Sequence, residues 1–323
     1  MKKCVLTAVL FLVMLSVPAL QAETMLYYTF EEGIAGNSME GSTVTDRANN
    51  PIYGAAGTWN LTASAGCLSG CDYPMYTAME TGWVPYGSQL CMYANGGYLQ
   101  SNVSAANLAA LTGSTSDSFT IEAWINAVRS GDNLQCVAGV YDVGGTANSW
   151  FLGVLAANPY QFKFYSELAC SDGGVYWVQN NTDLWYDQWY HVALTWDAAT
   201  SKVRIYVDGG PQADAVLPAG ITLKTSDQTP FTIGRFAGPV DDGAGQFTGH
   251  IDDVRLSDKA IDVPQMLITP PPSSCLEVQQ RGFGLALDLN ADCSVDLKDF
   301  AIISRSWLTC NVPGQTGCLQ NWY

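Results

Sequence analysis

The fold class follows from the segment HVALTWDAATSKVRIYVDGG, residues 191–210. It contains one β-type run from His191 to Trp196, a polar turn over 197–201 and a return run over 202–207. On the return run Val203, Ile205 and Val207 share one face, because side chains alternate with a two-residue period. Two such runs around a short turn predict an antiparallel β-hairpin.

Similar runs continue in both directions along the chain, at SFTIEAWINA (118–127), FTIGRFAG (231–238) and FTGHIDDVRLS (247–257). They are rich in β-branched and aromatic residues and are separated by turn residues. No long segment between them has a helical period. Short strands at this spacing predict an all-β protein, with a sandwich of two antiparallel sheets over about residues 24–268.

The first 22 residues differ from this body. They contain two lysines, an apolar core from about Val5 to Leu15, and small residues at Ala19 and Ala22. This is the layout of a secretory signal peptide that is cleaved after Ala22. A membrane anchor is the alternative, but the apolar run is shorter than the ~20 residues that span a bilayer. We therefore expect a protein that is secreted or held at the cell surface, with no membrane span after cleavage.

The charge balance excludes one class of partner. The chain has 30 acidic and 14 basic residues, for a formal net charge of −16. An anionic surface repels phosphate backbones, so we expect no nucleic-acid partner. The same surplus of carboxylates suits divalent cations.

Nine cysteines follow the predicted signal peptide, and export permits disulfides among them. Five precede a proline-rich break, so their odd number predicts one free or mispartnered thiol in that part. Spacing does not choose the pairs. The candidates are Cys67, Cys71, Cys91, Cys136, Cys170, Cys275, Cys293, Cys310 and Cys318.

The break itself, TPPPSS at 269–274, is typical of a stiff, solvated linker. The tail that follows, 275–323, is too short for a strong hydrophobic core and needs other stabilisation. Its four cysteines and its acidic loop are the candidate stabilising features.

That loop is DLNADCSVDLKD, residues 288–299. Oxygen-bearing residues occupy positions from which a twelve-residue loop wraps a calcium ion, with Ser294 offering its carbonyl. Cys293 replaces the usual glycine at position 6, and position 12 is Asp in place of Glu. A solvated acidic turn is the alternative, but this register favours Ca²⁺. The predicted ligands are Asp288, Asn290, Asp292, Ser294, Asp296 and Asp299.

Beyond the loop, Phe300, Ile303 and Trp307 lie at helical spacing and predict an apolar stripe that docks on the rest of the tail. The stretch LDLNADCSVDLKDFAIISRSWL resembles one repeat of a type I dockerin. Dockerins have two such repeats and bind cohesins, which tether exported proteins to a scaffold. The resemblance implies a calcium loop followed by a helix, and a cohesin-like scaffold partner. The alternative is a small stabilising module that is held together by disulfides and binds no partner.

The body also resembles a family, the laminin-G-like domains of the concanavalin A-like lectin/glucanase superfamily. The motifs occur in the family's order: YYTFEEG (27–33), DRANN (46–50), GGYLQ (96–100), SFTIEAWINA, WYHVALTWDAATSKVRIYVDG (189–209), FTIGRFAG and GHIDDVRLSDKAI (249–261). The resemblance implies a two-sheet jelly roll.

It also implies a calcium near the paired termini, with Asp46 and Asp252 at the matching positions. The two-residue period would turn Asp252 inward with Val254, where a carboxylate needs a cation or donors. Alternatively Asp253 lies at the site, or Arg255 or a backbone turn satisfies Asp252.

Sugar binding is the role that the superfamily resemblance implies most directly. A lectin face needs exposed aromatic rings and polar groups beside them. The segment 148–189 is rich in candidates, although sandwich aromatics also fill cores. The candidates are Trp150, Tyr160, Tyr165, Trp177 and Trp185.

The superfamily also contains glycoside hydrolases and lyases. Hydrolysis uses two carboxylates about 5–10 Å apart, and the sequence has no E-x-D-x-E-like run. Glu122 stands alone among apolar neighbours, adjacent aspartates of a strand point to opposite faces, and His191 is expected to be a paired sheet histidine. We therefore expect a non-catalytic carbohydrate-binding or adhesion protein. A glycoside hydrolase or lyase, or a structural cell-surface protein, is the alternative.

Overall fold

The computed structural model describes residues 22–48, 59–65, 72–79, 89–101, 118–130, 133–142, 148–224, 229–237, 245–268, 274–275, 288–290 and 292–306. The chain divides into two units, Ala22–Pro271 and a second unit that contains the chain from Pro272 onward with residues 1–21. The predicted signal peptide (apart from Ala22), Cys67, Cys71, Cys310 and Cys318 lie outside the described residues.

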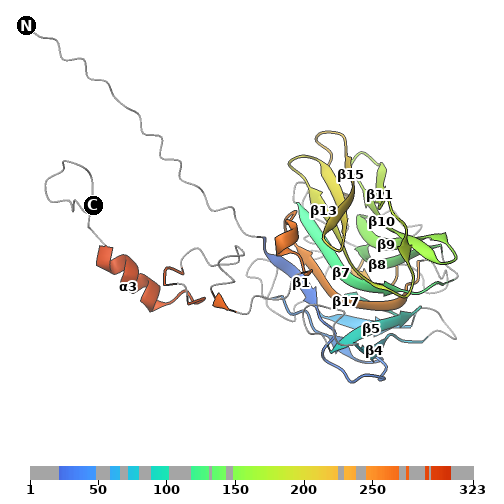
Figure 1. Ribbon diagram of the computed structural model, residues 1–323, viewed down its shortest axis with the longest axis horizontal. Helices are drawn as coiled ribbons and strands as arrows, with labels where there is room; N and C mark the ends of the chain where they lie inside the picture. The colour runs from blue at the N-terminus through green and yellow to red at the C-terminus, as the bar shows by residue number, and fades with distance from the viewer. Residues whose placement is uncertain are drawn as a thin grey trace, which may run out of the picture. The chain divides into compact units, whose positions relative to one another are not determined.

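The larger unit is a sandwich of two antiparallel sheets, which confirms the predicted fold class (Figure 1). The first sheet has the order β15 (Gly210–Val216), β14 (Lys202–Val207), β13 (Trp189–Asp197), β7 (Phe119–Ala127), β17 (Thr248–Ser257), β5 (Leu90–Asn95) and β4 (Met75–Ala78), and β1 (Thr24–Tyr28) pairs with β17.

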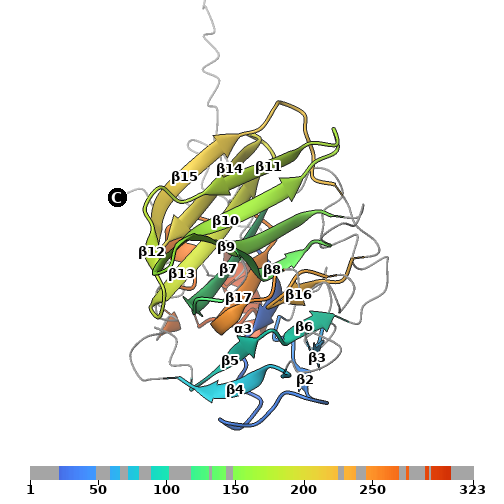
Figure 2. The same ribbon diagram turned by 90° about the vertical axis from the view of Figure 1, so that its right-hand side faces the viewer.

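The second sheet lies over the first, and Figure 2 shows its strands in front. Its order is β11 (Val175–Gln179), β10 (Gln161–Ala169), β9 (Trp150–Asn158), β8 (Leu134–Val140), β16 (Thr232–Ile233), β6 (Tyr98–Ser101), β3 (Leu61–Ser64) and β2 (Thr43–Val44), and β12 (Leu184–Trp185) pairs with β10.

The predicted hairpin is β13–β14. Leu194 pairs with Ile205 and Trp196 with Val203, and all four side chains are buried in the main core. Ser201 turns the chain with a φ of +51°. Each large apolar side chain that is buried in this way contributes about 1.5–3 kcal/mol. The inner faces of both sheets supply this core, so their outer faces carry the remaining side chains.

One register prediction is wrong. On β17, Asp252 pairs with Trp124 and Arg255 with Glu122, so β17 has one residue more than β7 between these pairs. Asp253 has a φ of +48° at this β-bulge. Because a bulge breaks the two-residue period, Ile251 and Val254 both face the core. Asp252 therefore does not share the face of Val254.

The adjacent aspartates do not follow strict alternation either. Asp252 lies beside Trp124 in the ladder, and the Asp253 carboxylate accepts a hydrogen bond from the Tyr27 hydroxyl. Tyr27 pairs with Arg255 and stands outside the core cluster. These partners place both carboxylates outside the apolar core cluster, although both aspartates are buried.

Three disulfide candidates are free thiols. Cys91, Cys136 and Cys170 are buried and unpaired. Cys91 packs with Trp124, Cys136 with Phe151, and Cys170 with the main core. Because each thiol lies in a different apolar cluster, they cannot meet one another. Burial raises the pKa of each thiol.

The smaller unit contains helix α3 (Leu297–Ser306), which follows the acidic loop as expected. A disulfide joins Cys275 to Cys293. Phe300 is 61% exposed, so in the described residues it does not dock as predicted, while the Ile303 side chain and Trp307 lie outside them. Among the described residues, no helix combines the length and hydropathy that a bilayer span requires.

Candidate functional site

The predicted aromatic candidates divide between the core and the outer face of the second sheet. Trp150 is fully buried in the core, so its prediction as a ligand-binding residue is wrong. It belongs to the inward set of β9 with Leu152 and Val154. Tyr160, Trp177 and Trp185 are 71%, 57% and 52% exposed.

Strand β10 sets the geometry of that outer face. Phe162, Phe164 and Leu168 face the core, so the intervening residues face outward. These are Gln161, Lys163, Tyr165 and Glu167. The outward face of β10 is therefore a row of polar side chains that runs along the strand beside the exposed tryptophans.

An aromatic row crosses this face at the far end of β10. Trp177 on β11 pairs with Glu167, and its ring stacks on Tyr165 with centroids 6.2 Å apart and planes 24° apart. Tyr165 contacts buried Phe151, which contacts Tyr141 with centroids 4.9 Å apart. Packing against a buried ring fixes the two tyrosines, and Tyr165 in turn fixes Trp177.

Glu167 lies in the middle of this row. Its two oxygens accept hydrogen bonds from the hydroxyls of Tyr141 and Tyr165, at 2.7 and 2.6 Å. Burial, followed by these bonds and the Glu167 charge, raises the pKa of both tyrosines. The hydroxyls therefore stay protonated and hold the carboxylate in place. Its remaining lone pairs can accept further hydrogen bonds.

The face extends to a second tryptophan. Trp185 on β12 pairs with Gln161, six residues along β10 from Glu167. At about 3.3 Å per residue, the two tryptophans flank a strip of roughly 20 Å. Lys163 lies within it and forms an ion pair with Asp183 at 2.7 Å. The face thus offers two exposed rings and a row of polar groups between them.

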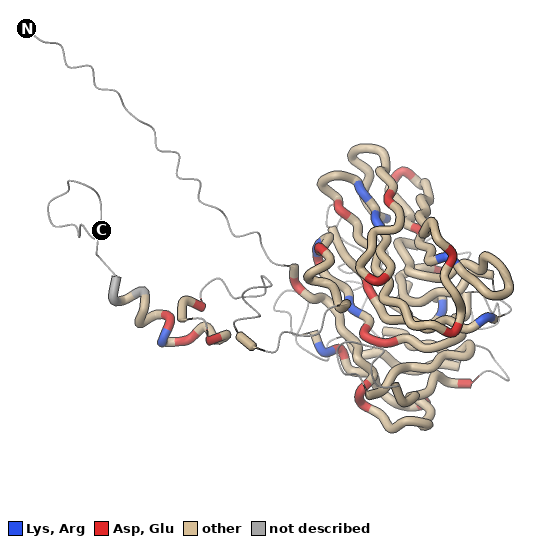
Figure 3. The backbone as a smooth tube through the Cα atoms, viewed as in Figure 1, with Lys and Arg blue, Asp and Glu red and all other residues tan. Residues whose placement is uncertain are grey.

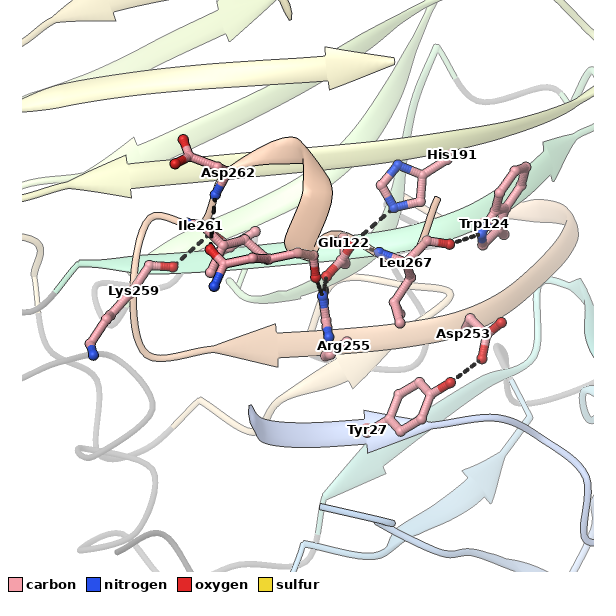
Figure 4. Close-up of polar contacts among 12 residues, drawn as sticks. Tyr27, Glu122, Trp124, His191, Asp253, Arg255, Lys259, Ile261, Asp262 and Leu267 are labelled. Atoms are coloured by element: carbon pink, nitrogen blue, oxygen red, sulfur yellow. Dashed lines mark hydrogen bonds and ion pairs between the residues drawn. The ribbon is translucent and has the colours of Figure 1, made fainter. Parts of the chain in front are cut away.

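A buried polar network on the outer face of the first sheet has a different role (Figure 4). Glu122 Oε2 accepts hydrogen bonds from His191 Nε2 at 2.9 Å and from the Leu267 amide at 2.7 Å. Its Oε1 accepts two from the Arg255 guanidinium, the Nε bond being 2.7 Å. Trp124 Nε1 donates to the Leu267 carbonyl at 2.9 Å.

These contacts hold the segment 258–268, which contains the 3-10 turn η1 (Val263–Gln265), across the sheet. Burial alone would raise the pKa of Glu122, but Arg255, His191 and the Leu267 amide lower it below its ordinary value. The network therefore fastens the segment 258–268 to the sheet, and we call it the Glu122 latch. Because Glu122 and His191 are fully buried, a substrate cannot reach it.

The two aspartates predicted to hold calcium in the sandwich are both buried. Asp46 Oδ1 accepts hydrogen bonds from the amides of Tyr27 and Ala48, at 3.1 and 3.0 Å. Asp252 Oδ1 accepts one from the Asp253 amide at 2.9 Å. Burial raises the pKa of Asp253 to about 6. Among the described residues, no group of three acidic, His or Cys ligand atoms contains Asp46 or Asp252. A calcium there stays a prediction.

In the smaller unit, the carboxylates of the acidic loop turn toward its backbone. Asp288 accepts hydrogen bonds from the amides of Asp292 and Cys293. Asp299 accepts bonds from Leu289, Asn290 and Asp296, and these lower its pKa. Figure 3 shows the concentration of acidic residues before α3.

Two further features of the loop fit a cation. The Lys298 ammonium lies 2.7 Å from Asp292 Oδ2 and 3.4 Å from Asp296 Oδ2, so these carboxylates already converge on one positive group. Cys293 has a φ of +65°, the left-handed conformation that the usual glycine adopts. The donor set therefore fits a hard divalent ion.

A model of the concanavalin A-like lectin/glucanases superfamily, Laminin_G_3, matches residues 95–266, more than half of the chain. The chain belongs to this superfamily. No curated protein matches it.

Solved structures similar to this concanavalin A-like chain include domain 4 of AbnA, a GH43 extracellular arabinanase from Geobacillus stearothermophilus, in complex with arabinotriose. The identity is 14%, the TM-score 0.46, and the match covers 76% of this chain and 96% of that one. Another is a putative carbohydrate binding protein from Bacteroides ovatus, with 27% identity, a TM-score of 0.38, and coverage of 50% and 44%. The placement in the superfamily rests on the family model.

Of the aromatic candidates named from the sequence, Tyr165, Trp177 and Trp185 lie on the outer face of the second sheet of this concanavalin A-like domain. The sequence did not single out Glu167 or Tyr141. The alternation of Gln161, Lys163, Tyr165 and Glu167 with apolar residues was the available signal.

Proposed function

We propose that this protein binds carbohydrate through the outer face of its second sheet, along β10 between Trp185 and Trp177. The observation that carries the proposal is the fixed pair of Trp177 and Tyr165 beside Glu167. An exposed indole offers an apolar face to a sugar ring, and a carboxylate beside it accepts hydrogen bonds from hydroxyls. The strip is long enough for an extended chain of several sugar rings.

The same geometry favours binding over hydrolysis. Hydrolysis uses a pair of carboxylates, one as an acid and one as a base or nucleophile. Glu167 is held by two tyrosine hydroxyls, and Asp183 is paired with Lys163. Both carboxylates are therefore held by donor groups, which suits a hydrogen-bond acceptor better than a proton-transferring acid.

The acidic loop is proposed to bind Ca²⁺ through Asp288, Asn290, Asp292, Asp296 and Asp299, with the Ser294 carbonyl as a further ligand. The ion would hold these oxygens together and so stabilise the start of α3. Leu297 and Phe300 are exposed there, and a cohesin-like scaffold partner would cover them if the module is a tether. The predicted signal peptide and the Cys275–Cys293 disulfide support a role outside the cell or at its surface.

A polysaccharide panel tests the carbohydrate proposal, with binding measured by affinity electrophoresis and calorimetry. Removing a buried interface tryptophan typically costs about 2 kcal/mol, or roughly 30-fold in affinity. Trp177→Ala should lose affinity to this extent. Val216→Ala is the control, because Val216 is an even more exposed apolar residue on β15 of the other sheet. Binding that is unchanged by Trp177→Ala would refute the proposed face, and release of sugar products would favour an enzyme.

A further inference from the structure

A cavity of about 390 Å³ opens on the outer face of the first sheet, on the opposite side of the sandwich from Trp177. This volume is in the range of small-molecule sites. Trp189, Asn126 and His250 are successive ladder partners across β13, β7 and β17, and all three line the cavity. Their neighbours Ile125 and Ile251 face the core. The cavity is therefore built on the centre of a sheet.

The Asn126 amide provides the first sign of a ligand. Its Oδ1 is buried and has no hydrogen-bond partner. A buried amide oxygen without a partner costs about 1–3 kcal/mol. Rotation of the amide would place Nδ2 there in its stead, and the same deficit would remain. This atom is closed to solvent, so the side chain must turn toward the cavity before a group that both donates and accepts hydrogen bonds, such as a hydroxyl, can satisfy either orientation.

His250 provides the second. Its ring contacts Tyr93 on one side, with centroids 4.9 Å apart, and Trp189 on the other, with centroids 6.0 Å apart. Burial lowers the pKa of His250, so the ring is neutral at pH 7. A neutral imidazole has one donor and one acceptor nitrogen. It thus complements a hydroxyl in the same way as Asn126.

The rim of the cavity is fixed by the backbone. Asp187 has a φ of +61°, and its amide donates to the Ala127 carbonyl at 2.9 Å. On the opposite strand pair, Gly249 has a φ of +134°, and a Cβ there would lie 2.2 Å from the Asn126 carbonyl. These contacts hold the turn before β13 and strand β17 close to β7. The opening is part of the sheet's own geometry.

We propose that this cavity binds one neutral, hydroxyl-rich ring, such as a single monosaccharide unit, with Trp189 as its apolar wall and Asn126 and His250 as its polar floor. Asp187 at the rim and the net charge of −16 oppose an anion. Thr77 and Gln188 supply further groups for hydroxyls. The site does not depend on the proposed face around Trp177.

Imidazole ¹H–¹⁵N NMR tests this inference directly, because the chain has only two histidines. His250 lines the cavity, whereas His191 is fully buried in the Glu122 latch and serves as an internal control. The probes are methyl glycosides of glucose, galactose, mannose and arabinose, titrated to tens of millimolar to detect weak binding. Choline and acetate are the charged comparison probes.

At least one glycoside should shift the His250 signals saturably and leave those of His191 in place. Asn126→Ala should weaken this binding about tenfold, as expected for a lost buried hydrogen bond. Trp177→Ala should leave it unchanged, which separates this site from the proposed face. If Asn126→Ala does not fold, Thr77→Val at the cavity wall takes its place, with a weaker but measurable loss expected.

Several results would overturn the proposal. They are a His250 signal that no glycoside moves, a shift that both cavity variants leave unaltered, and a response to choline or acetate alone.

Discussion

Replacing Glu122 by glutamine should destabilise the sandwich without changing its shape. Two carboxylate oxygens accept hydrogen bonds from four donor atoms: Arg255 Nε and Nη2, His191 Nε2 and the Leu267 amide. Glutamine keeps one acceptor oxygen and puts an NH₂ group in place of the other. Arg255 then loses its counter-charge, and at least one buried donor loses its partner, although Arg255 Nη2 still donates to the Gln265 carbonyl.

The size of the effect follows from these two losses. An unsatisfied buried donor costs about 1–3 kcal/mol and breaking a buried ion pair costs about 3–5 kcal/mol, so Glu122→Gln, which leaves Arg255 partly bonded, should lose about 2–5 kcal/mol of unfolding free energy. For a domain of this size, about 1 kcal/mol shifts the Tm by roughly 2–4 °C, so the Tm should fall by about 4–20 °C. Urea unfolding at pH 7 and calorimetry measure these two quantities.

The pH dependence provides a second readout. The pKa of Glu122 is lowered in the folded state, so its contribution is fully present above the unfolded value of about 4.3. It is lost as the pH falls below that value, through the folded pKa. The difference between wild type and Glu122→Gln should therefore shrink in acid. A difference below about 0.5 kcal/mol at pH 7 would refute the latch.

Other predictions concern the loop, the thiols and the tyrosines. Calcium should raise the Tm of the smaller unit in scanning calorimetry, and Asp288→Ala should abolish that rise; an equal rise in the variant would reject the loop as the site. Alkylation followed by peptide mapping should find Cys275 linked to Cys293, with Cys91, Cys136 and Cys170 labelled only after unfolding, whereas rapid labelling of the folded protein would contradict their burial. Tyr165→Phe removes one hydrogen bond to Glu167 and keeps the stacked ring, so glycan affinity should fall by about 1 kcal/mol, and a loss as large as that of Trp177→Ala would show that stacking is not the dominant contact.

Local patterns predicted the sandwich well, because alternation in the segment 191–210 reports directly which side chains are buried. Trp150 shows where the alternation of apolar and polar residues stops being informative. Trp150 and Phe151 are both fully buried, so β9 is apolar on both faces at that point. A strand without alternation gives no indication of which aromatic is exposed.

The bulge at Asp253 could not be read from the sequence either. An extra residue in β17 relative to β7 depends on how two distant strands align, and Asp252 and Asp253 carry no local sign of it. The cavity could not be predicted from local sequence for the same reason. Trp189, Asn126 and His250 are far apart in the sequence, and only the strand order brings them together.

Tryptophan indole NMR in the presence of the tightest-binding oligosaccharide of the panel tests the proposed carbohydrate-binding face most directly. The indole signals of Trp177 and Trp185, assigned by substitution, should shift together and saturate at the same ligand concentration. The signal of Trp150, which is enclosed in the core beneath the same sheet, should stay in place. Binding that saturates while the Trp177 signal does not move would contradict the account.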